Sequence, residues 1–138
     1  KLNKREIKEE LNRTEELIKK LVGEQPKLFR PPFGEYNNTL IETCQELDYY
    51  SIQWTIDSHD WMDVSSEYIK KRILNNVEPG AIILMHNNAE YTSQVLETII
   101  PLLKKKGYKI VPVSKLIYHK DYYIESHSGI QKKIRREE

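Results

Sequence analysis

Short apolar segments alternate with longer amphipathic segments along the chain, and this order limits the available folds more than any other feature of the sequence. Apolar or period-two character marks expected strands at residues 28–30, 50–57, 81–86 and 109–113. Apolar residues at helical spacing fill the intervals between these strands. Strands that alternate with helices usually form parallel sheets with the helices packed outside. The sequence therefore predicts an α/β fold built from parallel β/α units.

The helical segments carry recognisable ends. The expected helices cover residues 1–22, about 38–47, the segment after Ser65, the segment from Val95 to Gly107 and a short stretch after Ser114. Gly23 is suited to the C-cap of the first helix, and Ser65 to the N-cap of the third. Residues 119–138 are expected to form an extended, charged tail. We therefore predict one domain over residues 1–118, followed by this tail.

The composition limits the classes of partner. Twenty-two basic residues nearly balance 21 acidic residues, and the net charge of +1 gives no field that would favour nucleic acid. Cys44 is the single cysteine, which excludes a disulfide framework and a thiolate metal cluster within these 138 residues. No apolar run is long enough for a transmembrane helix, and no segment resembles a signal peptide.

Three of the expected strands end on a charged or titratable side chain. These residues are Arg30, Asp57 and His86. Because the C-terminal ends of parallel strands meet at one edge of a sheet, we expect the three side chains to lie close together. A carboxylate beside His86 would stabilise the charged imidazole, which suits a general acid. Each residue alone is more often structural, but their combination at one edge favours a site.

Three short motifs also resemble a known family in their order and spacing. FRPPFG at 29–34, DSHDW at 57–61 and ILMH at 83–86 resemble the last three of five motifs of the polysaccharide deacetylase family. This family is also called the NodB homology domain, or carbohydrate esterase family 4. The surrounding segments EPGAIILMH and KKKGYKIVPVSKL agree with the same resemblance, which extends to about Leu116. The resemblance implies the C-terminal part of a distorted (β/α) barrel.

The resemblance also implies a reaction. Members of this family use a divalent metal, usually zinc, to remove N-acetyl groups from a polysaccharide such as peptidoglycan or a chitin-like polymer. At the matching positions, His86 would be the acid that protonates the departing amine, and Asp57 the carboxylate that tunes it. Arg30 would orient the catalytic base.

The same motifs imply substrate-binding residues. The backbone N–H of Phe33 would help to hold the oxyanion of the tetrahedral intermediate. Trp61 and Leu84 would line the small pocket that receives the acetyl methyl group. The implied partner is an N-acetylated glycan polymer, and the implied location is extracellular or at the cell envelope.

Two motifs of the family are not found in this sequence. The first would supply the catalytic base and a metal-binding aspartate, and the second would supply two histidines four residues apart. His59, His119 and His127 do not have the spacing of a metal site. We therefore expect the metal only in a full-length parent and none in this chain, which we expect to be inactive alone. An uncovered sheet edge is also expected to favour self-association.

Two other functions fit parts of the sequence. A noncatalytic glycan-binding or interaction module would retain the groove without the metal-binding half. A flavodoxin-like regulatory or nucleotide-binding domain would fit the strand and helix order, but no expected strand is followed by a glycine-rich phosphate loop.

Overall fold

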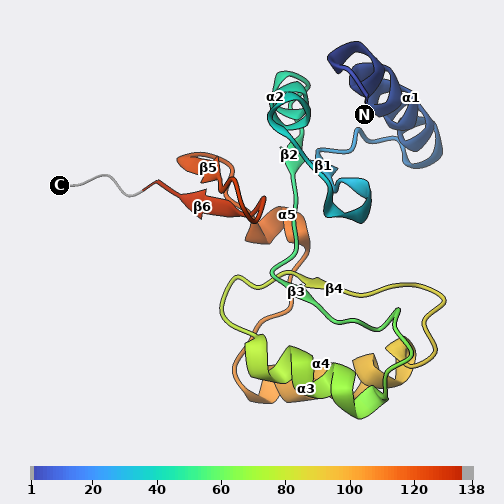
Figure 1. Cartoon of the computed structure of the whole chain (residues 1–138), viewed down its shortest axis with the longest axis vertical. Coiled ribbons are helices and arrows are strands. Elements are labelled where there is room, and N and C mark those ends of the chain that lie inside the picture. Colours follow the sequence, from blue (N-terminus) through green and yellow to red (C-terminus); the bar gives the residue numbers. More distant parts are fainter. Residues whose placement is uncertain (1, 135–138) are drawn as a thin grey trace. The chain divides into compact units, whose positions relative to one another are not determined.

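The computed structural model describes residues 2–134, which form two compact units (Figure 1). Among the described residues, the first unit comprises residues 2–53 and 118–134, and the second comprises Trp54–Ile117. None of the helices among residues 2–134 is both long enough and apolar enough to cross a bilayer.

The first unit contains helices, a parallel strand pair and a hairpin. Its elements are α1 (Lys4–Val22), β1 (Leu28–Phe29), the 3-10 turn η1 (Pro32–Gly34), α2 (Asn38–Glu46), β2 (Tyr50–Ser51), β5 (Tyr122–Ile124) and β6 (Gln131–Lys133). Strands β1 and β2 pair in parallel, and α2 connects them. Strands β5 and β6 pair antiparallel.

Helix α1 is fixed at both ends by the caps that its sequence supplies. The Asn3 side chain accepts hydrogen bonds from the N–H groups of Arg5 and Glu6, and the Glu6 carboxylate accepts one from the Asn3 N–H, which makes a capping box. Gly23 ends the helix at φ +80°, which confirms the predicted C-cap.

The core of the first unit is small. The buried side chains Ile7 and Leu11 of α1 form one cluster with Cys44 and Tyr49. Cys44 is fully buried, as expected for a cysteine that serves packing.

The second unit places two helices against a parallel strand pair. Its elements are β3 (Ile56–Asp57), α3 (Ser66–Asn76), β4 (Ile83–Leu84), α4 (Thr92–Lys105) and α5 (Val113–Leu116). Ser65 caps α3 by accepting a hydrogen bond from the Tyr68 N–H, as predicted. Figure 1 shows α3 and α4 lying side by side on the same side of β3 and β4. The core consists of Ile56, Ile69, Ile73, Val95, Ile99 and Leu103.

The predicted α/β class with parallel strands is confirmed. Both parallel pairs, β1 with β2 and β3 with β4, are joined by a helix. Each is a β/α/β unit of the kind that the alternating sequence pattern predicts.

Three expectations for secondary structure are wrong. Residues 50–57 do not form one strand, because β2 pairs with β1 and β3 pairs with β4, and the chain between them carries no strand. Residues 109–112 are irregular, and α5 begins at Val113 with Pro112 rather than Ser114 at its cap. Within its described part, the tail forms the β5–β6 hairpin instead of an extended segment.

Candidate functional site

Strand β4 directs alternate side chains to opposite faces of the sheet. Ala81, Ile83 and Met85 pack against the core of the second unit. The period of a strand therefore directs Leu84 and His86 to the other face. Asp57 pairs with Leu84 in the parallel register, so it lies beside Leu84 on the neighbouring strand. The structure thus brings together, within the second unit, the ends of the two strands that carry predicted site residues.

A buried carboxylate holds His86. The His86 backbone N–H donates to Oδ2 of Asp60 at 2.8 Å, and His86 Nδ1 lies 2.8 Å from Oδ1 of the same carboxylate. The Thr92 hydroxyl donates to Oδ2 at 2.6 Å. The Asp60 side chain is 0% exposed, whereas 34% of the His86 side chain is exposed. A carboxylate only accepts hydrogen bonds, so Nδ1 carries a proton and Nε2 is the nitrogen that remains for a ligand.

The hydrogen bonds around Asp60 favour its charged form. Burial opposes ionisation, but bonds from the Thr92 hydroxyl, the N–H and ring of His86, and Ser58 outweigh burial and hold the pKa of the Asp60 carboxyl below its usual value. Asp60 is therefore a carboxylate at neutral pH. The buried carboxylate in contact with Nδ1 fixes the orientation of the imidazole, as a positioned general acid requires.

The predicted pairing of His86 with Asp57 is corrected to a pairing with Asp60. The Asp57 carboxylate instead accepts the backbone N–H of His59 at 3.0 Å, in a local turn two residues long. His59 has φ +60°, in the left-handed region, and the chain changes direction there before Asp60. A catalytic role for Asp57 stays a prediction.

Asp60 lies in the motif DSHDW, which contains two aspartates. Sequence reasoning selected Asp57, because it ends an expected strand, and missed Asp60 in the following loop. No pattern in the sequence distinguishes Asp60 from Asp57 as the partner of His86. Thr92 lies outside all the motifs, and no pattern in the sequence singled it out.

Trp61 lies on the surface next to Asp60. Its side chain is 60% exposed, and its ring contacts the His59 ring with centroids 6.4 Å apart. A cavity of about 550 Å³ lies between the loop at residues 60–65 and the loop at residues 87–91. It is lined by Asp60 and Trp61 together with polar side chains that include Asp63, Asn87 and Asn88. A cavity of this size and polarity can receive a sugar unit.

Arg30 and Phe33 belong to the first unit. Arg30 is exposed and directly follows β1. Phe33 has φ +56° within η1, and its side chain is 95% exposed. Their roles, and those of Trp61 and Leu84 in the acetyl pocket, stay predictions.

Metal-binding side chains do not gather among the described residues. Within residues 2–134, no group of three or more His, Cys, Asp or Glu side chains has the arrangement of a metal site. The hydrogen-bonded Asp60 and His86 are only two such groups. These residues therefore do not fit the divalent metal that the resemblance implies.

Comparisons with known proteins agree with one another. Residues 1–52 match the sequence profile described as "Polysaccharide deacetylase". A peptidoglycan-N-acetylglucosamine deacetylase of Bacillus cereus is 33% identical over 120 residues, which cover 84% of this chain and 44% of that protein. The peptidoglycan-N-acetylmuramic acid deacetylase PdaC of Bacillus subtilis is 32% identical over 115 residues, which cover 83% of this chain and 24% of PdaC.

Solved structures show the same relationship. The Bc1960 peptidoglycan N-acetylglucosamine deacetylase aligns with a TM-score of 0.80 at 32% identity, covering 84% of this chain and 56% of that one. BA3943 of Bacillus anthracis, described as a pseudoenzyme of carbohydrate esterase family 4, aligns with a TM-score of 0.78 at 30% identity, covering 83% of this chain and 41% of that one. The chain spans less than half the length of the curated relatives that it matches.

Proposed function

This chain belongs to the polysaccharide deacetylase family, and from that premise we propose that it supplies the acid side of a site that removes N-acetyl groups from peptidoglycan or a chitin-like glycan. The observation that carries the proposal is the contact of His86 with the buried Asp60 carboxylate at the end of β4. Asp60 fixes the imidazole through Nδ1, which leaves Nε2 as the proton donor.

The acid has a defined task in this reaction. Hydrolysis of an N-acetyl amide forms a bond between a water oxygen and the acetyl carbon and breaks the C–N bond, whose electron pair passes to nitrogen. Expulsion of an unprotonated amine anion is very unfavourable, so nitrogen must receive a proton as the bond breaks. His86 would donate the proton from Nε2, and Asp60 would hold the ring in place through Nδ1 during the transfer. The products are acetate and a glycan amine.

The other assigned residues would complete the site in the parent protein. We propose that the Phe33 N–H stabilises the oxyanion and that Arg30 orients the base. Trp61 and Leu84 would line the acetyl pocket. Asp57, whose carboxylate bonds the His59 N–H, would act by fixing the loop that carries Asp60.

The proposed metal is zinc, but residues 2–134 offer no cluster that fits it, so we derive no step through a metal. The catalytic base is likewise not assigned to a residue of this chain. We therefore propose that the 138-residue chain is inactive alone and that activity requires a longer parent protein.

The proposed location follows from the substrate. The relatives named above are described as deacetylases of peptidoglycan, a polymer of the cell wall. We propose that the parent works outside the cytoplasm or at the cell envelope.

We also propose that the uncovered apolar surface of the first unit supports self-association, because several large side chains of α1 are exposed there.

A noncatalytic glycan-binding module is the alternative. The similarity to BA3943, which is described as a pseudoenzyme, supports a noncatalytic role as the second candidate function. The two functions differ in one measurable property, since only the enzyme releases acetate.

The test is acetate release by the full-length parent from N-acetylated peptidoglycan. We expect His86→Ala to lower the rate about 100-fold or more, because a general acid contributes about 100- to 10,000-fold. His127→Ala, in the exposed turn of the hairpin, is the matched control and should leave the rate unchanged. Equal rates for the wild type and His86→Ala would remove His86 from catalysis, and no acetate release by the wild type would favour the binding module.

A further inference from the structure

Three aromatic side chains gather on the surface of the second unit beside the candidate acid. They are His59, Trp61 and Tyr68, here called the aromatic cluster. The His59 ring lies 6.4 Å from the Trp61 ring, edge to face, and 6.4 Å from the Tyr68 ring, to which it is nearly parallel at 18°. Trp61 is 60% exposed and Tyr68 is 43% exposed. None of the three belongs to the core of the unit among the described residues.

The aromatic cluster includes a residue with a strained backbone conformation. His59 has φ +60°, a conformation that costs a residue other than glycine on the order of 1 kcal/mol. Two hydrogen bonds stabilise it: the His59 N–H donates to Asp57 Oδ1, and the Met62 N–H donates to the His59 carbonyl at 3.1 Å. The result is an imidazole directed to the surface, with its Nδ1 3.4 Å from the Tyr68 hydroxyl.

The cluster is joined to the candidate acid through the loop. His59 and Trp61 flank Asp60, the residue that holds His86. Trp61 also lines the 550 Å³ cavity between residues 60–65 and 87–91, whose other lining includes Asp63 and Asn88. Exposed rings therefore adjoin a polar cavity in one part of the surface.

This combination matches the surface of a sugar. A pyranose ring has faces of C–H groups that pack against aromatic rings, and a rim of hydroxyls that exchange hydrogen bonds with amides, carboxylates, phenols and imidazoles. Aromatic side chains supply large contact areas with little loss of torsional freedom. An apolar protein partner would leave the Tyr68 hydroxyl and the polar cavity walls without suitable contacts.

We propose that His59 and Tyr68, next to Trp61 of the acetyl pocket, form a glycan subsite that binds a sugar unit adjacent to the one from which the acetyl group is removed. This inference rests on the proposed function, because it takes the polymer at His86 to be an N-acetylated glycan. His59 and Tyr68 are binding residues here, and they extend the site from the 57–61 loop onto α3.

The experiment is a titration of the 138-residue chain with the tetramer of N-acetylglucosamine, followed by tryptophan fluorescence and amide NMR shifts. We expect saturable binding that Tyr68→Ala weakens about fivefold, since an aromatic contact of this kind contributes about 1 kcal/mol. Tyr68→Phe keeps the ring and should stay within about twofold of the wild type. Tyr123→Ala removes an exposed tyrosine of the first unit and is the matched control.

A second variant separates binding from folding. His59→Gly removes the ring but suits the positive φ, so it should retain the fold and still weaken binding. Absence of saturable binding by the wild type would overturn the subsite, as would equal affinities for Tyr68→Ala and Tyr123→Ala. The proposed function fails separately, because it is judged by acetate release and this titration requires no turnover.

Discussion

At the scale of single residues, Asp60 organises the second unit's candidate site. It lies between Ser58 and Trp61 in one loop and contacts the backbone and the ring of His86, two residues after β4, as well as Thr92 at the start of α4. One buried charge therefore ties together three segments that are distant in sequence. His86 and Thr92 both donate hydrogen bonds to the two Asp60 oxygens. The site therefore requires a carboxylate, because an asparagine amide would replace one acceptor oxygen with a donor.

We predict that Asp60→Asn lowers the free energy of unfolding of the chain by about 2 kcal/mol. Hydrogen bonds to charged groups contribute about 1.5–3 kcal/mol each, and the asparagine NH₂ would point its hydrogens at groups of His86 and Thr92 that are themselves donors. Urea unfolding at neutral pH, followed by circular dichroism, measures this change. Asp63→Asn, at an exposed position of the same loop, is the control and should change stability little. Equal losses for both variants would contradict the special role of Asp60.

The same variant should show a defined dependence on pH. The pKa of Asp60 is lower in the folded chain than in the unfolded chain, where it is about 3.9. The Asp60 carboxylate therefore stabilises the fold fully at pH values above the unfolded-state pKa. This stabilisation is lost as the pH falls through the folded-state pKa. The difference in unfolding free energy between wild type and Asp60→Asn should therefore be constant near neutral pH and shrink in acid. A difference that grows in acid would contradict the charged Asp60.

The residues of this site were predictable in part. The sequence predicted that strands leading to Asp57 and His86 end at one edge of a parallel sheet, and the structure pairs Asp57 with Leu84 in a parallel register. The sequence could not show that Asp60, rather than Asp57, binds His86, because the side chains of a loop do not alternate in direction with a regular period. His59, between the two aspartates, has a positive φ, and histidine does not signal that conformation as glycine would.

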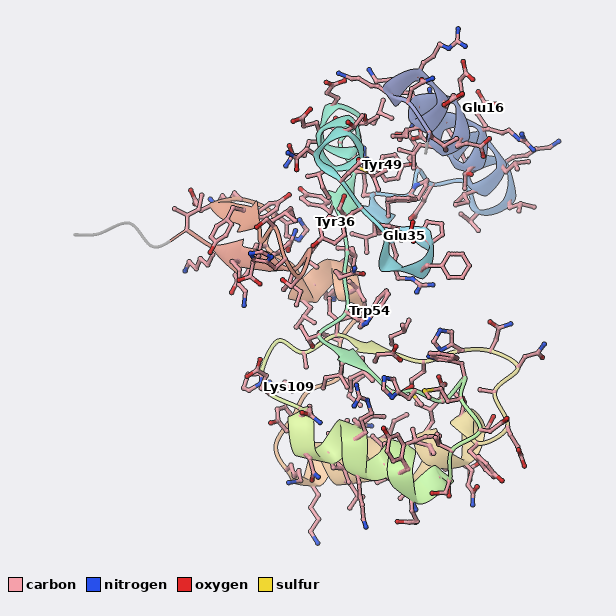
Figure 2. All side chains as sticks on the ribbon, in the orientation of Figure 1. Glu16, Glu35, Tyr36, Tyr49, Trp54 and Lys109 are labelled. Carbon is pink, nitrogen blue, oxygen red and sulfur yellow. The ribbon has the colours of Figure 1, made fainter. Side chains whose placement is uncertain are left out.

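At the scale of elements, the β5–β6 hairpin belongs to the first compact unit rather than to a free tail. Tyr36, labelled in Figure 2, donates its hydroxyl hydrogen to the Ser126 carbonyl at 2.9 Å. The Tyr36 ring also lies against Gly129, where a Cβ atom would come within 2.7 Å of it. The Tyr122 and His119 rings contact Tyr50 of β2. The hairpin is therefore attached to the first unit by aromatic contacts.

We predict that Gly129→Ala destabilises the hairpin by more than Gly23→Ala destabilises α1. Both glycines have positive φ, so alanine costs each about 1 kcal/mol of backbone strain. Only Gly129 would also collide with a ring, since a Cβ at Gly23 meets nothing within 4 Å. Amide hydrogen exchange at Tyr123 and Lys132 measures the opening of the hairpin. Exchange that is equally fast in both variants would contradict the contact.

Helices were predicted more accurately than strands, for a physical reason. A helix forms its hydrogen bonds internally, so periodicity and caps such as Asn3, Ser65 and Gly23 define it locally. The strands here are two or three residues long and exist through their partners. The alternation over residues 50–57 gave no sign that β2 and β3 would pair with different strands.

At the scale of the whole molecule, the match covers most of this chain but less than half of the full-length curated deacetylases named above. Its described residues contain the acid pair but no cluster suited to a metal. We therefore predict that the chain shows no tight stoichiometric zinc binding by isothermal titration calorimetry at neutral pH. A single saturating site that His86→Ala abolishes would contradict this prediction.

The first unit exposes several large apolar side chains. Leu17, Leu21 and Val22 of α1 are 57%, 81% and 67% exposed, and Phe33 is 95% exposed. A cavity of about 650 Å³ in the same unit is lined mainly by apolar side chains of α1, β1 and α2. Surfaces of this kind are stabilised by a covering partner, and a second copy of the chain is always present in solution. Self-association would remove the exposed leucines from water.

We predict that the chain's mean mass rises with concentration in sedimentation equilibrium. The double variant Leu17→Glu and Leu21→Lys should reduce this rise, because the charges would have to be buried on association. Both side chains are exposed, so the variant should change the free energy of unfolding by only about 0.5 kcal/mol. Ile110→Lys, at an exposed apolar position of the second unit, is the matched control and should associate like the wild type. A constant monomer mass at every concentration would show that the apolar surface of α1 does not bind a second copy.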